Sequence, residues 1–201
     1  MVASKKQIQT QAQAIISAAD AGLFATTVAL TEAFLKENPD SVRAWLDLGH
    51  ASTCLCRYDD AIAAYQKAID LAKDAGQNPD GIYSELGQLH RQRGDFELAA
   101  ECFQNQIEAN PDDAAGYLMS ATLLLQSGDP DQAIETLNRA LDCPSGIKEE
   151  VHFSLGTTYR SKGELVQARD QFQRALSISP DYAAAKTALK DTKSAISASQ
   201  T

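Results

Sequence analysis

Apolar and polar residues alternate with the period of an α-helix along most of the chain. In residues 80–113, two apolar-periodic segments, each about the length of a short helix, are separated by a turn at Gly94. Pro111 follows the second segment and cannot continue a helix. The large residues of the first segment fall on one helix face, at Tyr83, Leu86 and His90. This stretch therefore predicts two antiparallel helices joined by a tight turn.

The same pattern returns at nearly constant intervals. Small residues stand where two antiparallel helix backbones would approach closely, a large residue fills the layer beside them, and a glycine marks the turn. The small slots are Leu48-Gly49, Leu86-Gly87, Ser120-Ala121 and Leu155-Gly156 in the first helices and Ala61, Ala99, Ala133 and Ala168 in the second helices. The large slot holds Tyr65, Phe103, Leu137 and Phe172, and the turn slot holds Gly94, Gly128 and Gly163. A fixed period of this kind predicts a repeat array.

The order Trp45…Leu48-Gly49…Ala61…Tyr65, repeated downstream, resembles the tetratricopeptide repeat, a family of helix-turn-helix units. The resemblance implies an all-α fold, a right-handed superhelical α-solenoid that ends in a capping helix. We expect one domain over residues 1–201. Its repeats are expected at 8–41 (degenerate), 42–75, 80–113, 114–147 and 149–182, and its capping helix at 183–197.

Several positions depart from the repeat. Ile15 and Thr27 stand in the small slots of the first unit, as is common in terminal repeats. Residues 76–79 form a short insertion, which is either a longer helix and loop or a loop that contacts a partner. Pro130 is expected in a first helical turn. Lys190 stands in a small slot, so we expect a solvated last helix that buries one stripe, Ala185, Leu189 and Ile196, and frays from Ser197 to Thr201.

Charge and cysteine content narrow the class of protein. The formal net charge is −9 with both signs interspersed, which argues against binding to nucleic acid or to an anionic membrane surface. The charged start at Lys5 and Lys6 is followed by a polar stretch, so neither a signal peptide nor membrane insertion is expected. The four cysteines, Cys54, Cys56, Cys102 and Cys143, show no framework spacing. Cys54 and Cys56 are expected on one helix, where their side chains point in different directions and cannot easily share a metal or a disulfide. We expect free thiols and a cytoplasmic protein.

Motifs for catalysis are missing from the sequence. It has no His-Glu-x-x-His, no glycine-rich phosphate loop, no Gly-x-Ser-x-Gly and no Cys-x-x-Cys. His90 and His152 fall in core slots, and His50 falls on the inner face. The acidic pairs Asp59-Asp60 and Glu149-Glu150 fall at helix starts, where they complement the helix dipole. We therefore expect no enzyme, no cofactor and no metal.

In tetratricopeptide proteins the first helices of successive units line a concave groove that holds a peptide or a partner's helix. Carried over to this chain, the resemblance implies a partner-binding groove at Leu46, His50, Gln88, Arg91, Leu118, Thr122, Leu125, Phe153, Thr157 and Arg160. The basic and amide residues of the family's carboxylate clamp are replaced here, by Leu46, His50, Glu85, Ala115 and Met119. The ten groove residues, apolar in the middle with cations towards either end, suit a segment with aliphatic anchors. Leu118, Thr122 and Leu125 are expected to take the anchor. Arg91 and Arg160 each either pair with an acidic residue of the segment or stay solvated.

Three classes of function remain open. The first is a non-catalytic scaffold or adaptor that binds a protein or peptide partner in the groove. The second is an architectural protein that self-associates through its terminal repeats, because the weak first repeat offers an apolar face. The third is an accessory arm of a sulfotransferase or glycosyltransferase type of enzyme system, as the resemblance allows.

Overall fold

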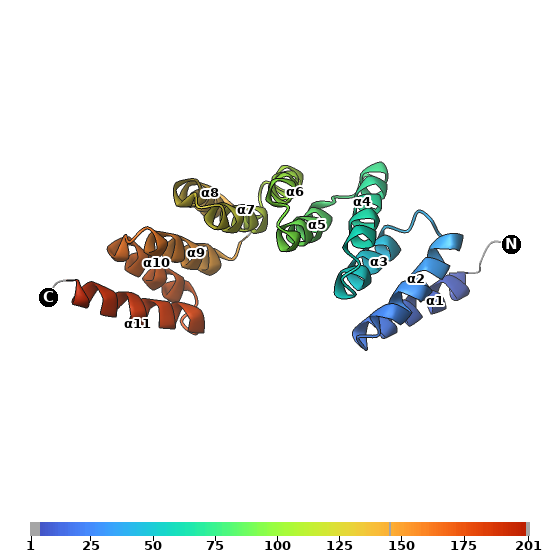
Figure 1. The fold of residues 1–201 in the computed structure, drawn as a ribbon, viewed down its shortest axis with the longest axis horizontal. Coiled ribbons are helices and arrows are strands. Elements are labelled where there is room, and N and C mark those ends of the chain that lie inside the picture. The colour runs from blue at the N-terminus through green and yellow to red at the C-terminus, as the bar shows by residue number, and fades with distance from the viewer. Residues whose placement is uncertain (1–4, 145, 200–201) are drawn as a thin grey trace. The chain divides into compact units, whose positions relative to one another are not determined.

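The computed structural model describes residues 5–144 and 146–199, and these residues form eleven α-helices and no strand (Figure 1). The helices are α1 (Lys5–Asp20), α2 (Phe24–Glu37), α3 (Val42–Cys54), α4 (Tyr58–Asp74), α5 (Asp80–Arg93), α6 (Phe96–Ala109), α7 (Ala114–Gln126), α8 (Pro130–Asp142), α9 (Lys148–Ser161), α10 (Leu165–Ile178) and α11 (Ala183–Ala198). The fold is an all-α helical-repeat solenoid. Each predicted repeat contains one pair of helices, with the acidic pairs in the first turns of α4 and α9 and Pro130 opening α8, as expected.

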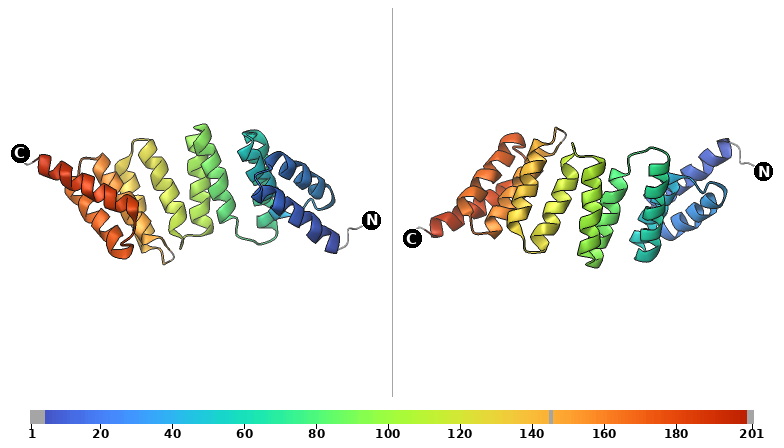
Figure 2. Two further views of the ribbon diagram at one scale, coloured as in Figure 1. Left: turned by 90° about the horizontal axis from the view of Figure 1, so that it is seen from below. Right: turned by 90° about the horizontal axis from the view of Figure 1, so that it is seen from above.

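The chain divides into two compact units, Met1–Cys102 and Phe103–Thr201, and each is described here by itself. In the first unit α1 packs on α2, α2 on α3, α3 on α4, and α4 on α5. In the second unit α7 packs on α8, α8 on α9, α9 on α10, and α10 on α11. Figure 2 shows α9, α10 and α11 side by side in both views. That 1–201 acts as one domain stays a prediction.

Small and large slots fit together inside each unit. A Cβ atom added to Gly49 would lie 2.6 Å from Cε1 of Tyr65, and one added to Gly156 would lie 2.6 Å from Cε1 of Phe172. Both rings are almost completely buried, so neither can move aside. The small residue in the first helix is therefore required by the aromatic ring of the second, which is the steric relation that the sequence pattern predicts.

Left-handed residues make the turns between paired helices. Gly94, Gly128 and Gly163 have φ angles of +84°, +82° and +79°. In the turn between α3 and α4 the same slot holds Cys56, with a φ of +57°. The expectation that Cys54 and Cys56 share a helix is therefore wrong, because α3 ends at Cys54 and the chain reverses at Cys56. A non-glycine residue in this conformation costs about 1–2 kcal/mol.

The thiols are all free among the described cysteines. Cys54 and Cys56 are exposed, and Cys102 and Cys143 are buried. Burial, and the charge of Glu101 after it, raise the pKa of Cys102 to about 11. Burial, followed by several nearby carboxylates, also raises the pKa of Cys143.

The terminal helices differ in part from expectation. Ile15 packs with Phe34, Leu35 and Ala44, so the core of the first helix pair is apolar. The exposed side of α1 carries Lys6, Gln9, Thr10, Gln13, Ala14 and Ser17, and the first repeat also exposes the large apolar residues Ile16, Leu23 and Leu30. That the first repeat self-associates through an apolar face stays a prediction.

The buried stripe of the last helix agrees with the predicted one only at Ala185. Ala185, Ala188 and Thr192 are buried in α11, whereas Leu189 and Ile196 are only half-buried. Small residues face inward where α11 packs on α10, and Leu189 packs against the cluster of Ala168, Phe172 and Ala188. The helix continues to Ala198, and the last two residues of the predicted frayed end lie outside the described residues.

Candidate partner-binding site

An open hollow of about 400 Å³ lies in the first unit between α3 and α5. Three elements build it: one face of α3, the end of α4 with the loop after it, and the first two turns of α5. Its lining residues are Val42, Leu46, His50, Ala72, Gln77, Asn78, Asp80, Gly81, Ile82 and Glu85. Two of them, Leu46 and His50, belong to the predicted groove.

The insertion at residues 76–79 explains why the hollow forms here. Helix α4 has 17 residues, whereas α8 in the second unit has 13. After α4, Gly76 takes a φ of +66° and Pro79, which is buried, stands at the N-cap of α5. The backbone N–H of Asp80 donates to the side-chain oxygen of Asn78 at 3.1 Å, which fixes the loop against the start of α5. The extra residues therefore form one wall of the hollow.

The base of the hollow is apolar and its rim is polar. Val42 and Leu46 are half-buried and pack against the core of the first unit, and Ile82 is 6% exposed. On the rim, Nε2 of His50 lies 3.6 Å from Oε2 of Glu85, and this contact lowers the pKa of Glu85. The His50 ring also meets the edge of Tyr65, with ring centroids 5.7 Å apart. A carboxylate is therefore held at the mouth of an apolar depression.

The other predicted residues of the first unit lie outside the hollow. Gln88 is half-buried and its amide donates to the Ser84 hydroxyl at 3.4 Å. Arg91 is half-buried too, and its Nε is buried without a hydrogen-bond partner. Both are further along α5 than the lining residues, so the structure does not bring them to the same depression.

In the second unit, Leu118 does not serve as the surface anchor that the sequence pattern suggests. It is 5% exposed and belongs to the core cluster that includes Val151 and Leu155. Thr122, one turn on, is exposed and its hydroxyl donates to the Leu118 carbonyl at 2.8 Å, while Leu125 is half-buried. Helix α9 packs against α7 and covers Leu118 with Val151 and Leu155.

The remaining predicted residues are near the C-terminal end. Phe153 packs between the rings of Phe172, at 5.7 Å, and Tyr182, at 5.1 Å. Thr157 donates to the Phe153 carbonyl at 3.0 Å. Arg160 is exposed, and its guanidinium lies 5.9 Å from the centroid of the Phe172 ring. Phe153 is thus partly used within the fold, and Thr157 and Arg160 stay accessible at its side.

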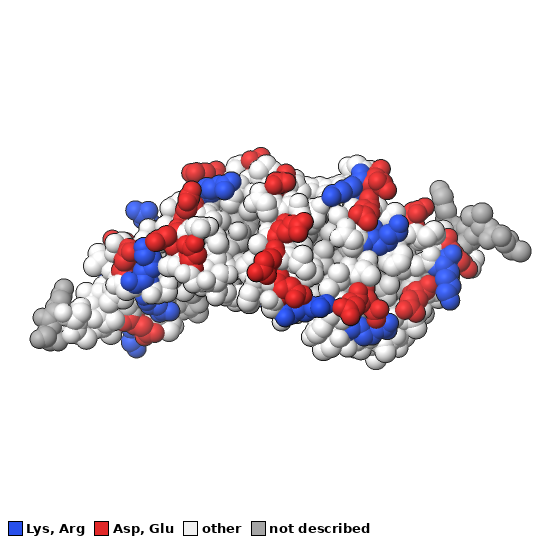
Figure 3. Space-filling view, turned by 45° about the horizontal axis from the view of Figure 1, so that its top comes forward, with Lys and Arg blue, Asp and Glu red and all other residues white. Residues whose placement is uncertain are grey.

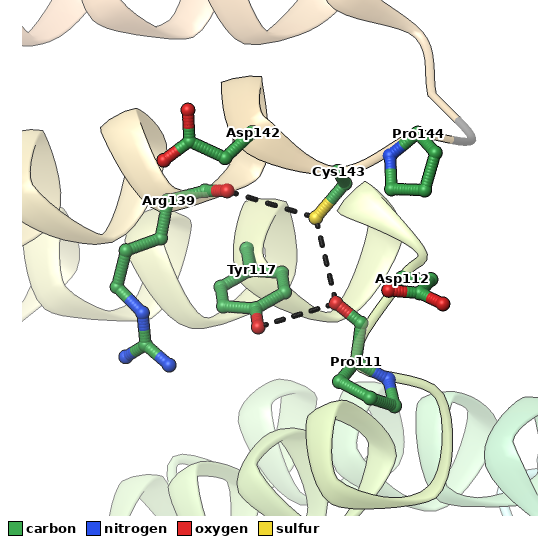
Figure 4. A pocket seen from close by; sticks show the side chains of 7 residues that line it. All are labelled: Pro111, Asp112, Tyr117, Arg139, Asp142, Cys143 and Pro144. Carbon is green, nitrogen blue, oxygen red and sulfur yellow. Dashed lines mark hydrogen bonds between the residues drawn. The ribbon is translucent and has the colours of Figure 1, made fainter.

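A second hollow, of about 290 Å³, is better explained as a structural junction (Figure 4). The Pro111 carbonyl accepts from the Tyr117 hydroxyl at 3.3 Å and from the Cys143 thiol at 3.6 Å. Arg139 lies with its guanidinium 5.1 Å from the Tyr117 ring centroid. In the first unit Trp45 donates to the Pro39 carbonyl at 2.7 Å in the same way, so this contact belongs to the repeat.

Charges of both signs are interspersed on the face of the molecule that Figure 3 shows. Figure 3 shows Lys and Arg side chains close to Asp and Glu side chains over the face in view. Among the residues that the structure describes, no three His, Cys, Asp or Glu side chains lie together as metal ligands would. Within the same part of the chain, no helix has the length and apolar character needed to cross a bilayer.

Sequence reasoning named three of the ten lining residues. It placed Leu46 and His50 on the inner face and Glu85 in a neighbouring slot, but it did not include Gly81 or Ile82. The available signal was the insertion at 76–79, for which a partner-contacting loop was one of two interpretations, and Gln77 and Asn78 of that loop line the hollow.

Comparison with curated sequences finds partial relatives. A kinesin light chain-related protein 3 of Arabidopsis thaliana is 27% identical over 153 residues, which are 65% of this chain and 23% of that protein. The general transcriptional corepressor ssn6 of Schizosaccharomyces pombe is 25% identical over 155 residues, which are 72% of this chain and 14% of that protein. The chain thus spans less than a quarter of the length of these relatives.

Solved structures share the fold. The crystal structure of MamA superposes with a TM-score of 0.67 at 24% identity, covering 80% of this chain and 91% of that one. YrrB, described as a TPR protein with an unusual peptide-binding site, superposes with a TM-score of 0.64 at 19% identity, covering 88% of each chain. MamA 41-end from Desulfovibrio magneticus RS-1 superposes with a TM-score of 0.72 at 15% identity, covering 91% of this chain and 99% of that one.

Three profiles of the tetratricopeptide repeat match this sequence, at residues 40–109, 84–146 and 149–182. The first two overlap and together cover more than half of the 201 residues. The paired helices, the small slots filled by Gly49 and Gly156, and the left-handed turns agree with these matches. The chain belongs to the tetratricopeptide repeat family.

Proposed function

We propose that this chain is a non-catalytic interaction scaffold that binds a peptide or helix of a partner protein on the inner faces of its first helices. The hollow between α3 and α5 carries the proposal, because it is an apolar depression with a small number of polar groups at its mouth. Exposed Thr122 and Arg160 offer further contacts in the second unit, independently of the first.

Self-association through the first repeat is the second candidate, because Ile16, Leu23 and Leu30 are exposed large apolar residues there. The relatives are several times longer than this chain, which is compatible with an arm of a larger assembly. Two exposed free thiols favour a reducing compartment, so we propose that the protein acts in the cytoplasm.

Affinity capture from a lysate of the source organism, followed by mass spectrometry, tests the proposal. The wild-type chain is compared with Gly81→Leu, which fills the hollow of the first unit, and with Thr122→Arg, which adds bulk and charge to the inner face of the second. A Cβ at Gly81 meets no atom within 4 Å, so the first change introduces no clash at that atom. We expect a partner that at least one of these variants loses.

Thr187→Arg is the matched control. Thr187 is exposed on α11 and donates to the Ala183 carbonyl at 3.2 Å, much as Thr122 donates to the Leu118 carbonyl. It is outside the predicted groove, so its partners should equal those of the wild type. If all three variants capture what the wild type captures, the inner faces are not the binding surface.

A further inference from the structure

We propose that the hollow between α3 and α5 takes an aliphatic side chain of a partner segment whose neighbouring residue is a lysine or arginine, with that cation held at Glu85. This inference rests on the proposed function and adds the chemistry of the bound segment. It depends on three properties of the hollow: its base, the sign of its charges and its size.

The base selects an aliphatic side chain. Val42, Leu46 and Ile82 line it, and none of them offers a hydrogen bond. Val42 and Leu46 keep part of their surface accessible, so apolar area remains to be covered. Burying such area contributes about 25 cal/mol per Å². A polar side chain placed there would lose its water without gaining a partner.

The charges select a cation. The ionisable residues that line the hollow are His50, Asp80 and Glu85, and no lysine or arginine lines it. Arg43, on the same helix as His50, is already paired, with its Nε 2.9 Å from Oδ1 of Asp47. The Glu85 side chain is 47% exposed beside His50, so an incoming ammonium or guanidinium can reach it. An acidic segment would meet repulsion at the same place.

The size matches a short stretch of chain. A hollow of about 400 Å³ lies at the lower end of the range of small ligand sites, about 300–1,000 Å³. One aliphatic residue and part of its neighbour fill such a space. The amides of Gln77 and Asn78 stand at the loop side of the hollow, where the backbone of the segment would pass.

The test uses the full chain and three dipeptide probes, N-acetyl-Leu-Arg-amide, N-acetyl-Leu-Glu-amide and N-acetyl-Ser-Arg-amide. Each is titrated into isotope-labelled protein while backbone amide shifts are followed by NMR. We expect the Leu-Arg probe to shift amides of α3, of the 75–79 loop and of the start of α5. It should bind about two- to fivefold more tightly than the Leu-Glu probe, as expected for a partly exposed ion pair. The Ser-Arg probe should bind more weakly than either.

Variants separate the two parts of the proposal. Glu85→Gln should remove the preference for Leu-Arg over Leu-Glu while leucine binding persists. Gly81→Leu should abolish binding of all three probes, and Gly81→Ala should weaken it less, because a methyl group fills less of the hollow. Glu32→Gln, a change at an exposed acid on α2, should leave the preference unchanged.

Three outcomes would overturn the inference: equal affinity for Leu-Arg and Leu-Glu, shifts confined to other helices, or no saturable binding of any probe. Failure of the proposed function gives a different result. If the probes fail but Thr122→Arg still loses a captured partner, the scaffold role stands and only the hollow's specificity is wrong.

Discussion

Leu46 in the first unit and Leu118 in the second occupy the same slot of the repeat, yet they have different surroundings. Leu46 is half-buried at the base of a hollow, whereas Leu118 is 5% exposed within a core cluster. The difference goes with the length of the second helix, because α4 has 17 residues and α8 has 13, whereas the connections to α5 and to α9 both have five residues. The end of the longer α4 and the loop after it line an accessible depression beside α3, whereas α9 packs against α7 in the second unit. A change in helix length between repeats can thus accompany the opening of a surface depression.

The largest expected effect is a stability difference between matched truncations. Leu118→Ala should lower the free energy of unfolding by about 2–4 kcal/mol, because it leaves a cavity in a packed core. Leu46→Ala should lower it by about 1 kcal/mol, since part of this side chain already meets solvent. Urea denaturation followed by circular dichroism measures both. Equal losses would show that the two slots are packed alike.

Two glycines extend the comparison, because their substitution by alanine should change the free energy of unfolding in opposite directions. Gly49→Ala places a Cβ 2.6 Å from the buried Tyr65 ring and should destabilise the protein by about 1–3 kcal/mol. Gly81→Ala places a Cβ in open space near the start of α5 and should stabilise it by up to about 1 kcal/mol. The same denaturation assay decides the signs, and a stabilising Gly49→Ala would contradict the tight contact.

Thiol reactivity tests whether the closed regions stay closed. Cys54 and Cys56 are exposed and should react with iodoacetamide at pH 8. Cys102 and Cys143 are buried and should react at least about tenfold more slowly. Burial shields both slow thiols and raises their pKa, to about 11 for Cys102, which keeps them protonated at pH 8. Peptide mass mapping of timed samples gives the four rates. Fast labelling of Cys143 would mean that the α8–α9 connection opens.

Much of this fold could be predicted from the sequence, because the repeat constrains each slot by local sterics. Gly49 and Gly156 have to be small for Tyr65 and Phe172 to pack, so their positions are visible without coordinates. The site could be predicted only in part. Exposure at Leu46 and burial at Leu118 depend on the next helix pair, and a pattern within one repeat does not contain that information.

Cys56 shows a second limit of sequence reasoning. The turn slot is filled by glycine in four other helix pairs, at Gly22, Gly94, Gly128 and Gly163, so a cysteine there hides the turn and extends the apparent helix. The left-handed backbone is imposed by the reversal of the chain, whatever residue occupies it. Aligning the turn slots, instead of following the helical period alone, would have placed Cys56 correctly.

The smallest expected effect concerns ion pairs that both units share at their turns. Arg93 pairs with Asp59 at 2.8 Å and with Asp95 at 3.1 Å, and Lys162 pairs with Asp131 at 2.6 Å and with Glu164 at 2.8 Å. In each unit a cation just before the turn glycine joins two successive helix pairs. Arg93→Gln and Lys162→Gln should each lower the melting temperature at pH 7 by only about 1–2 °C, because such pairs are close to solvent.

The Lys162 and Arg93 ion pairs should respond differently to alkaline pH, even though their geometry is alike. The carboxylates of Asp131 and Glu164 raise the pKa of Lys162, so its contribution is complete below the ordinary lysine value of 10.5 and is lost as pH rises through the higher folded value. Arginine keeps its proton throughout this range. The gap in melting temperature between wild type and Lys162→Gln should therefore shrink at high pH, while the gap for Arg93→Gln persists as far as the fold itself survives. If the melting-temperature gaps of both variants shrink together at high pH, the cause is a general loss of packing and not deprotonation of Lys162. The two turn contacts would then not be the independent ion pairs that their distances indicate.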